Sequence, residues 1–302
     1  MKVLLATDGS PNADMCVTTI CEGPLDKDSI VHSIAIHDPI QSRLFPKRLD
    51  EERAENIVTL AVKRISDAHP ECVVTGATLK GHPVTRILQV MESFEPDVLL
   101  MGAHARTSWR DDVLGKTSNE VLRRSSCSVV LVRADPNEKP KKAPRHLLCF
   151  DDTLVTLEAF SELERRIWPP ESEFVVLHVL IDLFETGSNN PEIDAEFAQR
   201  RMVERKVLME KSVEDQVTSL TRSLPGHKIT GLVVPESFGG PVDTILNTAE
   251  EIEADLIVMG SHQRKGIDRF WLGSVSEAVA EHAHCSVEII RPMLNTEVEE
   301  EK

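Results

Sequence analysis

The sequence has few basic residues, no long apolar run and no leader pattern, and each shortage excludes a class of protein. Lys and Arg number 34 against 50 Asp and Glu, which gives a formal net charge of -16. Such a surface repels nucleic-acid phosphates, so DNA and RNA are not expected as partners. No apolar run is long enough to cross a bilayer, and residues 1–5 do not begin a signal peptide. We expect a cytoplasmic protein that does not enter membranes.

Cysteine is sparse and unpaired. The six cysteines stand at positions 16, 21, 72, 127, 149 and 285, and no two form a Cys-x-x-Cys motif. This spacing favours mostly buried thiols over a disulfide framework or a zinc site. His282, His284 and Cys285 lie close together, but they span a predicted helix end and strand start without a second ligand cluster. No metal site is therefore predicted.

Two common nucleotide motifs are also missing. The run Gly115-Lys116-Thr117 looks like the end of a P-loop, but that motif requires a glycine at position 110, which is Arg. No Gly-x-Gly-x-x-Gly turn follows a predicted strand either. Neither a P-loop nor a dinucleotide fingerprint is expected.

What the sequence does contain is an internal duplication. Residues 101–106 and 114–118 recur as residues 259–264 and 272–276, and residues 2–10 recur as 145–153. The prolines and charges of residues 135–144 are typical of a linker. We predict a first domain at 1–134, this linker, a second domain at 145–293 and a solvated acidic tail at 294–302.

The repeats differ in length. Lys2 matches Arg145, an offset of 143, whereas Gly81 matches Gly239, an offset of 158. Repeat two therefore carries 15 extra residues (158 less 143) between its second strand and Gly239. The charged, helix-favouring stretch 190–223 predicts that they form a longer second helix.

Strands and helices are expected to alternate in each repeat. In repeat one we predict strands at 3–7, 29–36, 72–78, 97–101 and 127–132, and helices at about 11–22, 49–68, 83–94 and 116–125. This order predicts an α/β fold with a parallel sheet and helices on both faces. Ligands bind such sheets beyond the carboxyl ends of the strands, where Asp8, Ile36 and Gly102 would converge.

A glycine at a strand end, followed by the opening of a helix, is suited to phosphate. Glycine lets the backbone approach a ligand, and the first amides of a helix carry partial positive charge. Repeat two offers Gly273, Ser274 and Ser276 at this opening. Repeat one offers Gly115, Lys116 and Ser118, with Lys116 as a point charge.

With these motifs the chain resembles the universal stress protein family in its tandem form. The resemblance is carried by residues 4–10, 98–104 and 255–262, by 272–279 and by 285–287. It implies two doubly wound, Rossmann-like, nucleotide-binding domains, each with a five-stranded parallel sheet. It also implies that the edge strands 128–132 and 286–290 pair as an internal pseudo-dimer, with a further homodimer possible.

The family's ATP-binding pattern is Gly, two residues, Gly, nine residues, Gly, then Ser or Thr. Repeat one keeps Gly102 and Gly115 but has Ala105 and Lys116 at the other two places. Repeat two keeps Gly260, Gly273 and Ser274 but has Gln263 in the middle. A side chain at the middle position can obstruct the phosphate path: Ala105 adds only a methyl, whereas Gln263 adds a polar chain that could fill the path or form a hydrogen bond there.

The resemblance implies adenine nucleotide, ATP with or without magnesium, as the ligand. It implies that Asp8 and Asp151 reach the nucleoside, that Ile36 and Val179 border the adenine, and that Phe150 could crowd or stack on the base. The candidate binding set is Asp8, Ile36, Gly102, His104, Ala105, Gly115, Lys116, Thr117, Ser118, Asp151, Val179, Gly260, His262, Gln263, Gly273, Ser274, Val275 and Ser276. The alternatives are a ligand-free tight turn at the glycines, capping roles for the aspartates and backbone contacts for the histidines.

Three functions remain open at this point. The first is a stress-response protein that binds adenine nucleotide at one or both repeats and signals through conformation or partners. The second is an interaction module of the same fold that needs no nucleotide. The third, slow ATP hydrolysis, has little support because no nucleophile and base pair is evident and only Asp8 or Asp151 could assist a metal-bound phosphate. We predict no catalytic residue.

Overall fold

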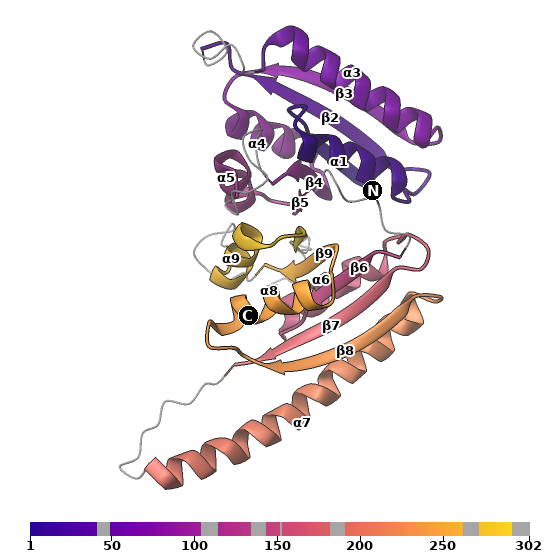
Figure 1. Cartoon of the computed structure of the whole chain (residues 1–302). Coiled ribbons are helices and arrows are strands. Elements are labelled where there is room, and N and C mark those ends of the chain that lie inside the picture. The colour runs from indigo at the N-terminus through magenta and orange to yellow at the C-terminus, as the bar shows by residue number, and fades with distance from the viewer. Residues whose placement is uncertain are drawn as a thin grey trace, which may run out of the picture.

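A single ten-stranded sheet runs through the computed structural model (Figure 1). The structure describes residues 1–40, 49–103, 114–133, 143–151, 153–181, 191–261 and 272–291, without the side chains of 154–155 and 191–199. The strand order is β3-β2-β1-β4-β5-β10-β9-β6-β7-β8. Each repeat contributes five parallel strands, as predicted, and the two halves have the same order read from opposite edges.

The elements follow the predicted alternation closely. Repeat one consists of β1 (Lys2–Ala6), α1 (Pro11–Glu22), β2 (Ile30–His37), α3 (Glu51–Ala68), β3 (Val73–Lys80), α4 (Pro83–Phe94), β4 (Val98–Gly102), α5 (Lys116–Arg124) and β5 (Ser128–Val132). Repeat two consists of β6 (Arg145–Cys149), α6 (Leu154–Glu164), β7 (Glu173–Leu180), α7 (Pro191–Ser223), β8 (Lys228–Pro235), α8 (Gly240–Glu251), β9 (Leu256–Gly260), α9 (Ser274–His282) and β10 (Ser286–Ile290).

Local sequence fixes where the first helix of each repeat begins. Ser10 accepts a hydrogen bond from the amide of Ala13, and Pro11 follows in the first helical position. Thr153 accepts from the amide of Thr156 at the start of α6. Hydroxyl N-caps of this kind satisfy amides that have no acceptor within the helix.

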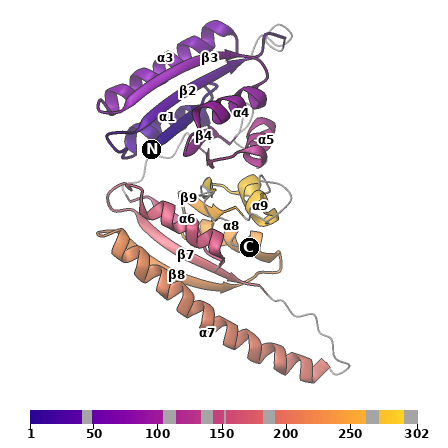
Figure 2. The ribbon, with the colours of Figure 1, turned by 180° about the vertical axis from the view of Figure 1, so that it is seen from behind.

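The two faces of the sheet pack differently. On the face of α4, α5, α8 and α9, one cluster of buried apolar residues runs through both repeats and includes Leu99, Val129, Ile257 and Val287. On the face of α1, α3, α6 and α7, each repeat has a core of its own. Figure 2 shows these helices from behind. The shared core joins the repeats into one folding unit.

The repeats meet along their last strands. Strands β5 and β10 pair antiparallel, with Val129 opposite Ile289 and Leu131 opposite Val287. The pairing confirms the internal pseudo-dimer and removes two edges that would otherwise expose unpaired backbone groups.

The extra length of repeat two falls in two places. His37 pairs with Lys80 and Leu180 with Pro235, so the offset is 143 at β2 and β7 but 155 at β3 and β8. Twelve extra residues (155 less 143) therefore precede β8, where α7 has 33 residues against 18 in α3. The other three are residues 236–238, just before Gly239. The prediction that all 15 lie within 190–223 was wrong for these three.

Helix α7 runs well past the edge strand that it covers (Figure 1). Val203, Val207 and Leu208 on it are exposed. No helix among the described residues combines the length and apolarity that a bilayer span requires.

Candidate functional site

The predicted ligand residues lie at the point where the strand order reverses. Strand β1 lies between β2 and β4, with Ala6 opposite Ile34 on one side and Met101 on the other. Asp8 follows β1, Ile36 lies near the end of β2 and Gly102 ends β4. All three are half-buried. Neighbouring carboxyl ends of this kind form the usual ligand crevice of doubly wound sheets.

Repeat two has the same arrangement. Strand β6 lies between β7 and β9. Asp151 follows β6 and is exposed, Val179 lies near the end of β7 and Gly260 ends β9, both half-buried. The duplication therefore extends to the places of the candidate residues.

Gly102 is required by packing. A Cβ built on it would lie 2.9 Å from Asn12 Cβ and 3.2 Å from the amide nitrogen of Ala13, at the start of α1. Because backbone atoms cannot give way cheaply, a side chain here would displace the helix. Glycine at this position has a structural cause that does not depend on a ligand.

Helices α5 and α9 open alike. Gly115 precedes α5 with φ -58° and ψ 144°, and Gly273 precedes α9 with φ -66° and ψ 146°. The first intrahelical bonds are Asn119 N to Gly115 O and Glu277 N to Gly273 O. The amides of each helix that come before Asn119 or Glu277 therefore have no acceptor within the helix. No side chain among the described residues caps them. Beside these amides, Lys116 and Ser274 are exposed, and Thr117 and Val275 are half-buried.

A matched hydroxyl bond ties each helix to its glycine strand. Ser118 Oγ donates to the carbonyl of Gly102 at 2.8 Å, and Ser276 Oγ donates to that of Gly260 at 3.2 Å. Both serines are buried. Their protons are therefore used to position the helix, and only their oxygen lone pairs remain for other partners.

The two aspartates have different local partners. Asp8 Oδ1 accepts from the amide of Ser10 at 2.9 Å. Asp151 Oδ1 accepts from the hydroxyl of Thr153 at 2.7 Å, from its amide at 3.2 Å and from the hydroxyl of Thr156. Sequence reasoning did not single out these threonines. A threonine at an expected N-cap, followed three residues later by a second threonine, is a visible signal for such a hydroxyl cluster. Both aspartates hold the turn that follows their strand.

The thiols near these aspartates are poor nucleophiles. Burial, with Asp8 second, raises the pKa of Cys16 far above its usual value. Burial also raises the pKa of Cys149, followed by the effects of Cys285 and Asp151. All six cysteines are free; Cys16 and Cys127 are buried and the other four are half-buried.

Phe150 is part of the core, so the expectation that it could crowd or stack on a base was wrong. Its side chain is 3% exposed and packs against Phe160 of α6 with ring centroids 5.7 Å apart. Side chains alternate along a strand, so Phe150 follows Leu148 toward α6.

Four candidate residues, His104, Ala105, His262 and Gln263, lie outside the described residues. The middle of each glycine loop stays a prediction. No group of three His, Cys, Asp or Glu side chains within the described ranges could hold a metal.

The comparisons with known proteins agree with the duplicated fold. The model of the universal stress protein family matches residues 1–133 and again 145–291. The chain is 24% identical to a universal stress protein of Mycolicibacterium smegmatis over 96% of this chain and 97% of that one. It is 26% identical to one of Mycobacterium bovis over 80% and 78%.

A solved structure shows the same fold over the whole length. The universal stress protein of Archaeoglobus fulgidus superposes with a TM-score of 0.62 at 20% identity, covering 96% of both chains. Since the family model matches both repeats, the chain belongs to the universal stress protein family, with two such domains on one polypeptide.

Proposed function

We propose that the protein binds adenine nucleotide, ATP with magnesium, at the crevice of one or both repeats and passes the bound state to partners in a stress response. The observation that carries this proposal is the matched opening of α5 and α9. Each begins at a glycine beside the strand-order reversal, with uncapped amides and an exposed donor, Lys116 or Ser274, in the first turn. A helix opening of this kind favours phosphate oxygens.

The residues present fit such a ligand. The openings at Gly115 and Gly273 would hold phosphate oxygens, and Ile36 or Val179 would border the base. The carboxylates of Asp8 and Asp151 would face the nucleoside or its magnesium ion, which prefers oxygen ligands. The ion would neutralise phosphate charge, which matters in a chain of net charge -16.

Calorimetric titration of the full chain with ATP and magnesium tests the proposal. The variants are Lys116→Gln and Ser274→Ala, which each remove an exposed donor without touching the core. Lys63→Gln is the matched control because Lys63 is exposed on α3, away from the helix openings. We expect a loss of affinity of about 10-fold at the altered site, the size of one charge-assisted hydrogen bond, and none for the control. No heat of binding in the unaltered chain would refute nucleotide binding.

A second candidate is an interaction module that needs no nucleotide. The exposed Val203, Val207 and Leu208 on α7 favour it, because exposed apolar side chains that lie close together on a helix mark a contact surface. Equal partner capture with and without ATP, lost in Val203→Ser/Val207→Ser, would support this candidate over the first. Replacing the exposed Thr218 of α7 by Ser is the control.

A further inference from the structure

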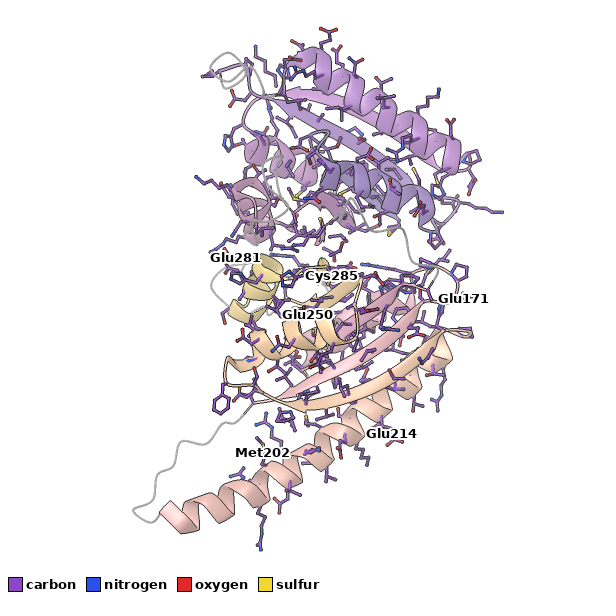
Figure 3. The ribbon with its side chains drawn as sticks, viewed as in Figure 1. Glu171, Met202, Glu214, Glu250, Glu281 and Cys285 are labelled. Atoms are coloured by element: carbon purple, nitrogen blue, oxygen red, sulfur yellow. The ribbon has the colours of Figure 1, made fainter. Side chains whose placement is uncertain are left out.

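At the seam formed by the paired strands β5 and β10, each repeat has an arginine that contacts the backbone of the other repeat. Arg133 follows β5 of repeat one, and its guanidinium donates to carbonyls of repeat two: Ala280 at 2.6 Å, Glu281 at 3.4 Å and Cys285 at 3.4 Å. Glu281 and Cys285 lie on the side of repeat two that faces repeat one (Figure 3). Arg291 follows β10 of repeat two and donates to the carbonyl of Leu122 of repeat one at 2.8 Å.

The backbone of each arginine is anchored in the same reciprocal way. The amide of Arg133 donates to Ser286 Oγ at 3.2 Å, and the amide of Arg291 donates to Ser128 Oγ at 3.1 Å. Arg133 is half-buried and Arg291 is buried. A pattern made twice by residues 158 positions apart is a built feature of the seam.

Apart from that of Cys285, the carbonyls that the arginines hold belong to the last turns of α5 and α9. The last carbonyls of a helix have no donor within it and carry partial negative charge, which a cation stabilises. Ala280 and Glu281 lie in the last turn of α9, and Leu122 lies in the last turn of α5. Each arginine therefore acts as a C-terminal cap for a helix of the other repeat.

A short chain of contacts leads from each arginine to the glycine loop of its own repeat. The carbonyl of Val132, the residue before Arg133, accepts from the amide of Ala103 at 3.0 Å. The carbonyl of Ile290, before Arg291, accepts from the amide of Ser261 at 3.0 Å. Ala103 and Ser261 directly follow Gly102 and Gly260. A backbone hydrogen bond therefore links the start of each glycine loop to the residue before an arginine, and the side chain of that arginine contacts the helix of the other repeat.

We propose that Arg133 and Arg291 are positioning residues that each hold the helix of the other repeat's site, and that they couple the two crevices. A nine-residue helix is about 13 Å long, so a shift at its C-terminus moves the amides at its opening. Arg123 of α5 and Glu277 of α9 form an ion pair that also links the two helices. The positioning role stands on these contacts, and the coupling of ligands rests on the proposed nucleotide function.

Hydrogen exchange of the full chain without ligand tests the positioning role. In Arg133→Gln we expect amides in the last turn of α9 to exchange about 5- to 10-fold faster, with α5 unchanged, because the lost bonds all end in repeat two. Arg291→Gln should have the opposite pattern, with faster exchange in α5 and no change in α9. Arg291→Lys keeps the buried charge and should have a smaller effect in α5. Arg86→Gln is the control, since Arg86 Nε bonds the carbonyl of Lys80 within its own repeat at 2.8 Å.

The same measurement with ATP and magnesium tests the coupling. In the unaltered chain, filling one crevice should change the affinity of the other by about 5-fold or more, and Arg133→Gln should bring that factor toward one. Exchange that rises equally in α5 and α9, or in neither, would overturn the positioning role. If ATP protects neither helix in the unaltered chain, nucleotide binding and coupling both fail, whereas the cross-repeat effect of Arg133→Gln without ligand still stands.

Discussion

Repeat one and repeat two share a sheet, a strand order and the opening of their site helices, but they differ in buried polar residues of their outer layers. Val130 of repeat one pairs with Glu288 of repeat two, and it is also the residue of repeat one that matches Glu288 at the offset of 158. Repeat two instead buries Glu288 beside Arg166 and packs His146 against both Trp168 and Phe174. The bonds from Ser118 to Gly102 and from Ser276 to Gly260 are kept in both. The geometry around the strand ends is thus the constrained part of the domain, and the outer layers are free to diverge.

The buried ion pair should show the largest difference between the repeats. Glu288 is 2% exposed and Arg166 22%, with 2.5 Å between Oε1 and Nη1. In Arg166→Met an uncompensated charge stays buried, so we expect the free energy of unfolding in urea to fall by about 3–5 kcal/mol. Adding Glu288→Val, which copies repeat one, should restore most of the loss. The control Arg165→Met breaks an exposed pair with Glu162 and should cost about 1 kcal/mol or less. A double variant no more stable than the single one would contradict this account.

His146 should make repeat two sensitive to acid. It is 5% exposed, and neither ring nitrogen has a partner within the described part of the chain. Burial lowers its pKa from 6.5 to about 4, opposed by Asp255 and aided by His227. Above pH 6.5 the ring is neutral in both the folded and the unfolded state, so its titration does not change the free energy of unfolding. Between pH 6.5 and 4 only the unfolded chain binds the proton. The free energy of unfolding therefore decreases as the pH is lowered through this range, by about 3 kcal/mol in all.

The variant His146→Leu separates this effect from other acid-sensitive groups. Its unfolding free energy, followed in urea from pH 7 to 4, should fall by about 3 kcal/mol less than that of the unaltered chain. His82→Leu is the control, since His82 is exposed at the N-cap of α4. Identical pH profiles for His146→Leu and the unaltered chain would show that the buried ring does not titrate as described.

Sequence alone predicted what repeats in the pattern. The alternation of elements, the pairing of 128–132 with 286–290 and the long helix of repeat two are all confirmed. The alternation and the long helix follow from local propensity and from a duplication that is visible in the residues, whereas the pairing was implied by the resemblance to the universal stress protein family. The expectation about Phe150 is wrong because strand alternation from Leu148 places its ring in the core.

Side-chain contacts between distant segments were beyond reach of the sequence. Gly102 looked like a phosphate glycine, but its nearest neighbours are Asn12 and Ala13, about ninety residues away in the chain. Arg133 and Arg291 stood at matching positions, yet nothing local showed that each caps a helix of the other repeat. Such roles depend on packing geometry, which periodicity does not encode.

Two matched glycines sharpen the comparison of the outer helices. A Cβ on Gly76 of β3 would meet Val58 and lie 2.7 Å from Val62, whereas one on Gly231 of β8 would lie 2.5 Å from Val213 and 3.2 Å from Val217. Repeat one therefore has two close neighbours and repeat two only one. We expect Gly76→Ala to cost about 2 kcal/mol and Gly231→Ala about 1 kcal/mol of unfolding free energy, measured in urea. The reverse order would mean that α7 yields less readily than α3.

The smallest effect should come from Phe238, in the three residues that repeat one lacks. Its side chain is fully exposed, so Phe238→Ser should change the unfolding free energy by less than about 0.5 kcal/mol. Phe160→Ser, in the core of the same repeat, is the matched control and should cost about 3 kcal/mol or more. A loss above about 1 kcal/mol at Phe238 would show that the ring packs in solution. A change below about 0.5 kcal/mol would show that this aromatic side chain adds nothing measurable to the stability of repeat two, as expected for a single exposed apolar residue.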